Sequence, residues 1–72
     1  MLNKKLIIKV SGLNSKEDVN ILKNELNKIK GIKSIKVYLK NKKVILNHVD
    51  DINILELKKG IEDLGYKYIG VE

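Results

Sequence analysis

At the centre of the chain lies the stretch SIKVYLKNKKVILN, residues 34–47. Apolar side chains alternate with polar ones up to Lys40, and the alternation resumes at Lys43. An alternation of period two is typical of a strand with one buried face, and Asn is common in the turn between two strands. The stretch therefore predicts a β-hairpin that turns at Asn41-Lys42.

A helix is predicted on the N-terminal side of this hairpin. Ser15 is a good N-cap residue, and Glu17 and Asp18 place negative charge in the first turn. Gly31 is the residue expected to stop the helix. The apolar stripe that this helix would bury consists of Val19, Leu22, Leu26 and Ile29.

A second helix is predicted on the C-terminal side, ending at Gly65. Asp50, Asp51 and Asn53 all offer caps for it, and Glu56 follows Asn53 by three residues, as in a capping box. Its apolar stripe consists of Ile54, Leu57, Ile61 and Leu64.

The two ends of the chain complete the pattern. Residues 5–10 alternate as a strand does before Gly12, and residues 67–71 form a final short strand. The order β-α-β-β-α-β predicts one α+β domain over residues 1–72, a ferredoxin-like sandwich whose four-stranded antiparallel sheet carries both helices on one face. The side chains expected to face the helices are Leu6, Ile8, Val10, Ile35, Val37, Leu39, Val44 and Leu46. The open face would carry Lys5, Ile7, Lys9, Lys36, Tyr38, Lys43 and Ile45.

The composition excludes several classes of site. Without any cysteine, neither a disulfide nor a thiolate metal site can form. The apolar run Leu6-Ile7-Ile8 is too short for a signal peptide or a membrane span. We therefore expect a cytoplasmic protein with no membrane span.

Charge is high and unevenly distributed. Fifteen lysines and nine acids give a net charge of +6 without any arginine. Residues 33–43 hold five lysines and no acid, whereas six acids and three lysines follow His48. This asymmetry predicts a basic and an acidic face, although lysines also serve simply as a solubilising surface. Because arginine is the usual residue for bidentate phosphate and base recognition, specific nucleic-acid binding is not expected; nonspecific, salt-sensitive contact is a weaker alternative.

Three motifs stand out along the chain: Val10-Ser11-Gly12-Leu13-Asn14, Gly31-Ile32-Lys33-Ser34-Ile35-Lys36-Val37 and Ile61-Glu62-Asp63-Leu64-Gly65-Tyr66. Together they resemble the motifs of heavy-metal-associated domains, the family of copper chaperones and of N-terminal modules in copper-transporting ATPases. The first resembles the entry to the family's metal loop, with Leu13 at the methionine position. The second resembles its second-strand motif, and the third resembles the end of its second helix. The resemblance spans nearly the whole chain and implies the same βαββαβ fold.

The metal loop departs from the family pattern at its two cysteines, whose positions fall on Ser15 and Asp18. The family binds Cu(I) through two thiolates because a soft ion prefers sulfur. A hydroxyl and a carboxylate are hard donors, so we expect neither Cu(I) delivery nor a bound cofactor. Asp18 as the anchor of a non-thiolate metal site is the alternative; N-capping by Ser15 explains the same residues more simply.

His48 is the only histidine, and the topology puts it at the end of the molecule opposite the loop. With Asp50 and Asp51 it suggests a weak surface site for Zn²⁺ or Ni²⁺. The favoured interpretation is a solvent-facing or partly buried histidine at the end of a strand.

Six residues are expected to gather at the loop end of the molecule, which we call the loop pole: Leu13, Asn14, Lys40, Lys42, Lys43 and Tyr66. The resemblance implies that this end meets the partner domain, with Tyr66 beside the loop. A loop without metal ligands but flanked by lysines favours docking on an acidic surface of a protein partner.

Catalysis has little support, because no set of nucleophile, base and orienting group is recognisable and no glycine-rich phosphate loop occurs. The open face offers Tyr38 for base stacking, fewer aromatic residues than RNA-recognition modules use. The prediction is a non-catalytic interaction module of heavy-metal-associated fold. It would dock on a protein partner, or form a homodimer through its open face. The alternatives are a metal-transport accessory domain using Asp18, and nonspecific nucleic-acid binding.

Overall fold

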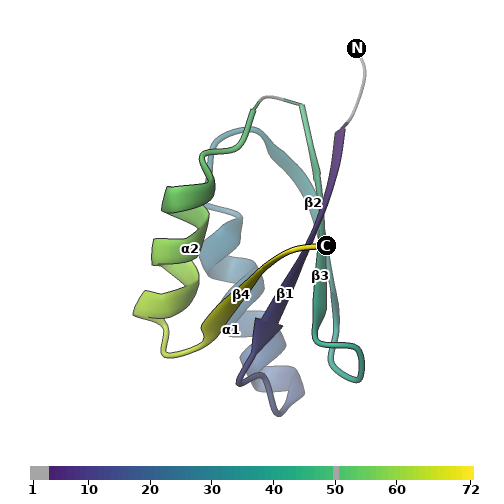
Figure 1. Ribbon diagram of the computed structural model, residues 1–72, viewed down its shortest axis with the longest axis vertical. Coiled ribbons are helices and arrows are strands. Elements are labelled where there is room, and N and C mark those ends of the chain that lie inside the picture. The colour runs from purple at the N-terminus through teal and green to yellow at the C-terminus, as the bar shows by residue number, and fades with distance from the viewer. Residues whose placement is uncertain (1–3, 50) are drawn as a thin grey trace.

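The computed structural model describes residues 4–49 and 51–72 and contains the six predicted elements in the predicted order. They are β1 (Lys4–Ser11), α1 (Lys16–Leu26), β2 (Ile32–Tyr38), β3 (Lys43–His48), α2 (Ile54–Asp63) and β4 (Lys67–Val71) (Figure 1). Met1 to Asn3 and Asp50 lie outside the described residues. The two predictions for Asp50, as a helix cap and as a ligand in a metal site with His48, therefore also fall outside the described residues.

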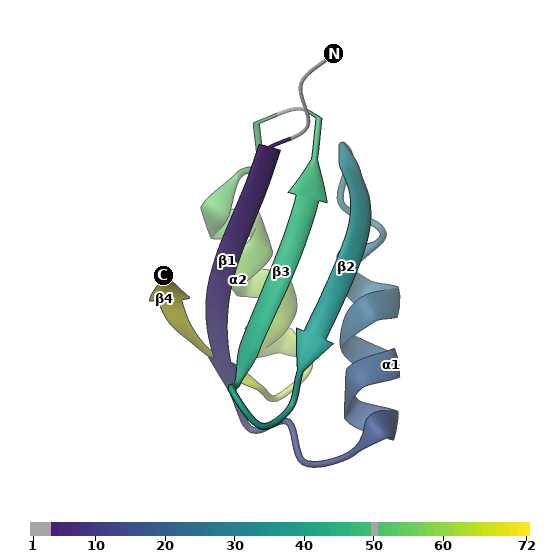
Figure 2. The same cartoon turned by 90° about the vertical axis from the view of Figure 1, so that its right-hand side faces the viewer.

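The sheet is antiparallel throughout, with the strand order β2-β3-β1-β4 (Figure 2). Both helices lie on the same face, as predicted (Figure 1). In the register between β1 and β3, Lys9 lies opposite Lys43 and Lys4 lies opposite His48. The loop that follows β1 and the turn of the β2–β3 hairpin therefore share one end of the molecule, and His48 lies at the other.

The hydrophobic core fills the space between the sheet and the two helices. Its fully buried side chains are Ile8, Val10, Leu22, Leu26, Val44, Leu46, Leu57 and Ile61. Four further side chains that were predicted to face the helices are half-buried against them: Leu6, Ile35 and Val37 on the strands, and Leu39 in the turn that follows β2. The predicted division of the sheet into a core face and an open face is confirmed, because the period-two pattern assigns side chains to faces directly.

Helix α1 is shorter than the sequence pattern predicted. It ends at Leu26, and the chain reaches Gly31 through a turn in which the Lys28 N–H donates to the Glu25 carbonyl and the Ile29 N–H to the Leu26 carbonyl. Asn27 is a poor helix former and interrupts the pattern one turn before the glycine. Ile29 nevertheless packs against the core, so the predicted apolar stripe remains in use beyond the end of the helix.

Both helices begin at the predicted caps. The Ser15 hydroxyl accepts the Asp18 N–H at 3.3 Å, and the Asn53 side chain accepts the N–H groups of Leu55 and Glu56 at 3.0 and 3.3 Å. These bonds satisfy backbone donors that a helix leaves unpaired at its N-terminus. Within the described part of the chain, neither helix is long and apolar enough to cross a membrane.

Candidate functional site

The loop pole brings together three segments that are far apart in the sequence. The Val10 N–H donates to the Lys42 carbonyl at 3.0 Å, which joins the end of β1 to the hairpin turn. Gly12 has a φ of +98° and lies against Tyr66, so closely that an added Cβ would be 3.6 Å from the Tyr66 Cα. Leu13 is buried in the core, 9% exposed. The loop after β1 is therefore fixed by its contacts with the hairpin turn and with the residue preceding β4.

Asp18 is the centre of a hydrogen-bond network in this loop. Its Oδ2 accepts the backbone N–H of Asn14 at 2.8 Å, and its Oδ1 accepts the hydroxyl of Tyr66 at 2.8 Å. Its own backbone N–H donates to the Ser15 hydroxyl. The loop, the first turn of α1 and the approach to β4 are thus tied together by a single side chain. The sequence placed Tyr66 near Leu13 and Ser15 but gave no indication of this network.

The network shifts the acid–base properties of both side chains. The pKa of Asp18 lies below its ordinary value, chiefly because the Asn14 N–H stabilises the charged carboxylate and next because the Tyr66 hydroxyl does so. The pKa of Tyr66 is raised, first by burial of the phenol and then by its hydrogen bond to Asp18. At neutral pH the pair is therefore a carboxylate acceptor and a neutral phenol donor.

These residues do not fit the soft metal ion that the family resemblance implies. The Ser15 hydroxyl caps α1, and each Asp18 oxygen accepts a hydrogen bond within the protein. Both groups are hard oxygen donors, whereas Cu(I) prefers thiolates and thioethers. Over residues 4–49 and 51–72, no three His, Cys, Asp or Glu side chains gather where they could hold a metal ion.

The three lysines of the loop pole, Lys40 and Lys42 in the hairpin turn and Lys43 at the start of β3, differ in their surroundings. Lys43 Nζ forms an ion pair with Glu72 Oε1 at 2.8 Å, a contact that the sequence did not suggest. Lys40 and Lys42 are exposed and form no ion pair with any described residue. Lys42 has a φ of +56°, the only positive φ of a residue other than glycine in the described ranges. The free positive charge of the loop pole is thus carried by Lys40 and Lys42.

The open sheet face is basic with an apolar centre. Ile7 and Ile45 lie opposite each other in the register and are half-buried, and the exposed side chains around them are Lys5, Lys9, Lys36 and Tyr38. Tyr38 is on the edge strand, as predicted. Tyr68 packs against the core instead of joining it. One exposed tyrosine on an edge strand is a poor platform for stacked bases.

The expectation that His48 faces solvent or is only partly buried is wrong. His48 is 7% exposed, in register with Lys4 on one side and Ile32 on the other. It shares the parity of Val44 and Leu46, so the alternation along β3 carries its side chain to the core face. That parity was visible in the sequence. His48 lies far from the loop, as predicted. Its neighbour Asp51 forms an ion pair with Lys4, in which Oδ1 and Nζ are 2.8 Å apart.

Comparison with known proteins places this geometry in a class. No protein-family model matches the chain, and no curated protein matches it by sequence. Solved structures match over nearly its whole length. The CopZ metallochaperone has a TM-score of 0.84 at 28% identity, covering 92% of this chain and 100% of its own.

Two further structures belong to N-terminal domains. That of a potential copper-translocating P-type ATPase from Bacillus subtilis, in its Cu(I)-loaded state, has a TM-score of 0.85 at 23% identity, covering 99% of this chain and 92% of its own. The N-terminal domain of ZntA in its apo-form has a TM-score of 0.87 at 17% identity, and the match covers 99% of this chain and 96% of its own.

The protein is therefore similar to the small α+β metallochaperones and metal-transporter modules, with the ferredoxin-like fold that the sequence predicted. Its fold is like that of heavy-metal-associated domains, and its sequence contains no cysteine.

Proposed function

We propose that this chain is a small non-catalytic interaction module that has the shape of a metallochaperone domain, lacks its thiolate site, and docks on a protein partner through the loop pole. The hydrogen-bond network of Asp18 carries this proposal. A carboxylate whose two oxygens are used to hold the loop has a structural task and is not poised to receive an ion. The loop is thereby fixed without metal, in a shape suited to recognition.

The charge at the loop pole supports an acidic partner surface. Lys40 and Lys42 project from the hairpin turn, and complementary charge raises association rates and fixes orientation. Lys42 moreover holds a left-handed backbone conformation that glycine or asparagine adopts more easily. A lysine kept in such a conformation is consistent with a functional demand on its side chain.

The first experiment tests the loss of the metal site. Amide NMR spectra are recorded while Cu(I), Zn²⁺ and Ni²⁺ are titrated against a competing chelator. We expect no saturable shifts in residues 13–19 or at Tyr66. Saturable shifts confined to those residues would instead support the metal-binding alternative, with Asp18 as the anchor and oxygen ligands around it.

The second experiment tests docking. Lys40→Glu/Lys42→Glu reverses the charge of the loop pole, and Lys58→Glu/Lys59→Glu makes the same change of net charge on the exposed face of α2. Partners captured by the wild-type protein from cells that produce it are eluted at increasing salt. We expect the loop-pole variant to lose a salt-sensitive partner that the control retains. Equal capture by both variants would exclude the loop pole as the docking surface.

Self-association through the open face is a second way in which such a module could act. The half-buried pair of Ile7 and Ile45 favours it, and the lysines around that pair oppose it. Sedimentation equilibrium of wild type and Ile45→Lys distinguishes a dimer from a monomer. Location in the cytoplasm stays a prediction of the sequence.

A further inference from the structure

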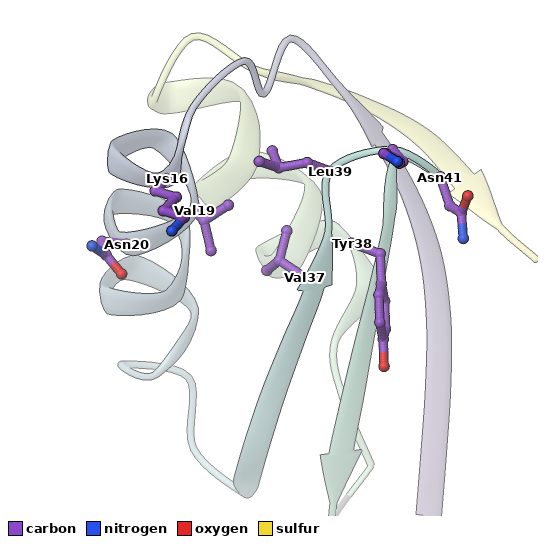
Figure 3. A pocket seen from close by; sticks show the side chains of 8 residues that line it. Lys16, Val19, Asn20, Val37, Tyr38, Leu39 and Asn41 are labelled. Atoms are coloured by element: carbon purple, nitrogen blue, oxygen red, sulfur yellow. The ribbon is translucent and has the colours of Figure 1, made fainter.

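A groove lies beside the loop pole, between α1 and the edge strand β2. Its volume is about 620 Å³, and its apolar walls are Val19 from α1 and Val37 and Leu39 from the β2 side (Figure 3). Lys16, Asn20 and Lys40 stand at its rim. Tyr38 points away from α1, on the other side of β2 (Figure 3). The groove is thus apolar within and positively charged at its border.

The backbone next to this groove is an unpaired strand edge. The Val10 N–H bonds to the Lys42 carbonyl, and the Glu72 N–H bonds to the Ile7 carbonyl. Because hydrogen-bonding direction alternates along a strand, even-numbered residues of β1 bond to β3 and odd-numbered ones to β4. By the same alternation, the residues of β3 whose backbone groups do not bond to β1 bond to β2. Their partners in the register include Lys36 and Tyr38, whose N–H and C=O groups therefore point toward β3. Ile35 and Val37 therefore present their N–H and C=O groups outward.

We propose that β2 and this groove form a strand-addition site for an extended segment of a protein partner in which apolar and acidic residues alternate. The proposal deepens the proposed function and rests on it, since it names a surface and a partner segment for an interaction module. A segment paired with Ile35 and Val37 would turn alternate side chains into the groove. Its other side chains would lie on the open face beside Lys36.

Charge selects the occupant. The border of the groove and the outer face of β2 carry Lys16, Lys36 and Lys40, and no acid occurs from residue 33 to residue 43. Acidic side chains on the incoming strand would pair across the sheet with Lys36, and unlike charges stabilise such cross-strand pairs. Lysines on an edge strand also hinder uncontrolled pairing with further copies of the chain.

The usable length of β2 is set by its irregularity. The register between β2 and β3 shifts between Ile32 and Ser34, and such a bulge protects the start of an edge strand. Regular pairing is therefore available from Ser34 to the end of the strand at Tyr38. The opposite edge, β4, has Gly70 within it and contributes no residue to the lining of this groove. This comparison favours β2.

The probe for the test is a displayed library of short random peptides, selected against the immobilised full chain. We expect enriched peptides to alternate apolar residues with Asp or Glu. When an enriched peptide is added, the amide hydrogens of Ile35 and Val37 should become protected from exchange. Those of Lys36 and Tyr38, already bonded to β3, should change little. This difference separates strand addition from simple occupation of the groove.

The matched variants use the same net charge change at two places. Lys16→Glu/Lys36→Glu reverses charge beside the groove and leaves the loop pole intact, and Lys58→Glu/Lys59→Glu is the control on α2. Two surface ion pairs predict about tenfold weaker peptide binding for the first variant at low salt. The control should bind within about twofold of wild type.

The proposal is overturned if no peptide is enriched, if bound peptides leave Ile35 and Val37 exchanging as before, or if both variants bind alike. Any of these results leaves docking at the loop pole standing, because Lys42→Glu alone, at a residue outside the groove lining, tests that docking separately. Conversely, peptide binding at β2 together with unchanged partner capture by the loop-pole variant would move the docking surface to β2.

Discussion

Asp18 occupies the position at which the family resemblance places a metal-binding cysteine, and its carboxylate connects three parts of the chain. It accepts hydrogen bonds from the Asn14 N–H and the Tyr66 hydroxyl while its own N–H bonds to Ser15. The side chains at the two positions that the resemblance assigns to cysteines, Ser15 and Asp18, thus both accept hydrogen bonds from groups of the protein. At the residue scale, a carboxylate at one of these positions holds the loop by hydrogen bonds.

The pH dependence of stability follows from this network. The folded pKa of Asp18 is below the ordinary value of about 3.9, so in acid the folded chain binds fewer protons than the unfolded chain. The contribution of the Asp18 carboxylate to the free energy of unfolding is complete above the ordinary pKa. It disappears as the pH falls through the lowered pKa of the folded chain. Asp18→Asn should therefore flatten the acid limb of the stability curve, measured by urea unfolding between neutral pH and strong acid.

The control for this measurement is Asp63→Asn, which removes a charge from the exposed end of α2 and touches none of these hydrogen bonds. Its acid limb should keep the shape of the wild-type curve. An Asp18→Asn curve that also keeps this shape would contradict a stabilising role for the carboxylate.

Tyr66→Phe separates the two donors of the network. Without the hydroxyl, the pKa of Asp18 should rise toward its ordinary value. The rise should be incomplete, because the Asn14 N–H is the larger cause of the shift. The carboxyl carbon resonance of Asp18, followed by NMR against pH, reports this pKa directly. Tyr68→Phe, which lies against the core, should leave it unchanged. A Tyr66→Phe titration identical to wild type would show that the phenol does not bind Asp18 in solution.

At the scale of secondary-structure elements, sequence patterns that act locally were reliable. Alternation along the strands predicted the two faces of the sheet, and Ser15 and Asn53 predicted both helix starts, because capping depends on residues close together in the sequence. The end of α1 was predicted too late, because the prediction rested on Gly31 as the residue that stops the helix and left out the low helix propensity of Asn27. The Asp18 network could not be predicted, since it depends on how the loop backbone turns and on Tyr66, 48 residues away.

The β2–β3 turn contains a lysine whose backbone is unfavourable for stability. Lys42 has a φ of +56°, where a side chain with a Cβ is strained. Lys42→Gly should raise the free energy of unfolding by up to about 1 kcal/mol. The strain energy removed from the folded chain should exceed the free-energy cost of the additional conformational entropy that glycine has in the unfolded chain. Lys40→Gly, at a residue without positive φ, should give no such gain. Denaturant midpoints of both variants decide the matter, and equal midpoints would contradict strain at Lys42.

At the scale of the whole molecule, exposed positive charge and an open apolar groove lie at the same end. The hairpin turn carries Lys40 and Lys42, and the groove between α1 and β2 opens beside it. Chain folding explains this coincidence, because the antiparallel register places the hairpin turn and the loop after β1 at the same end. Ser15 and Asp18, to which the family resemblance assigns the two cysteine positions, lie at this same end. The absence of metal ligands thus leaves a charged, shaped surface without the ion.

Whether the loop has the geometry that the family resemblance implies is tested by placing thiolates at the two cysteine positions. Ser15→Cys/Asp18→Cys removes the carboxylate network and supplies two soft ligands at the family positions. We expect one tightly held Cu(I) per chain in competition with a Cu(I) chelator. Ser34→Cys/Asp63→Cys is the matched control. Ser34 lies on the open face of the sheet and Asp63 in the helical layer, so its two thiols cannot converge on one ion. A folded Ser15→Cys/Asp18→Cys protein that binds copper no better than this control would mean that the loop has lost the family geometry together with its ligands. The Asp18 network would then define a loop shape that differs from the one the family resemblance implies.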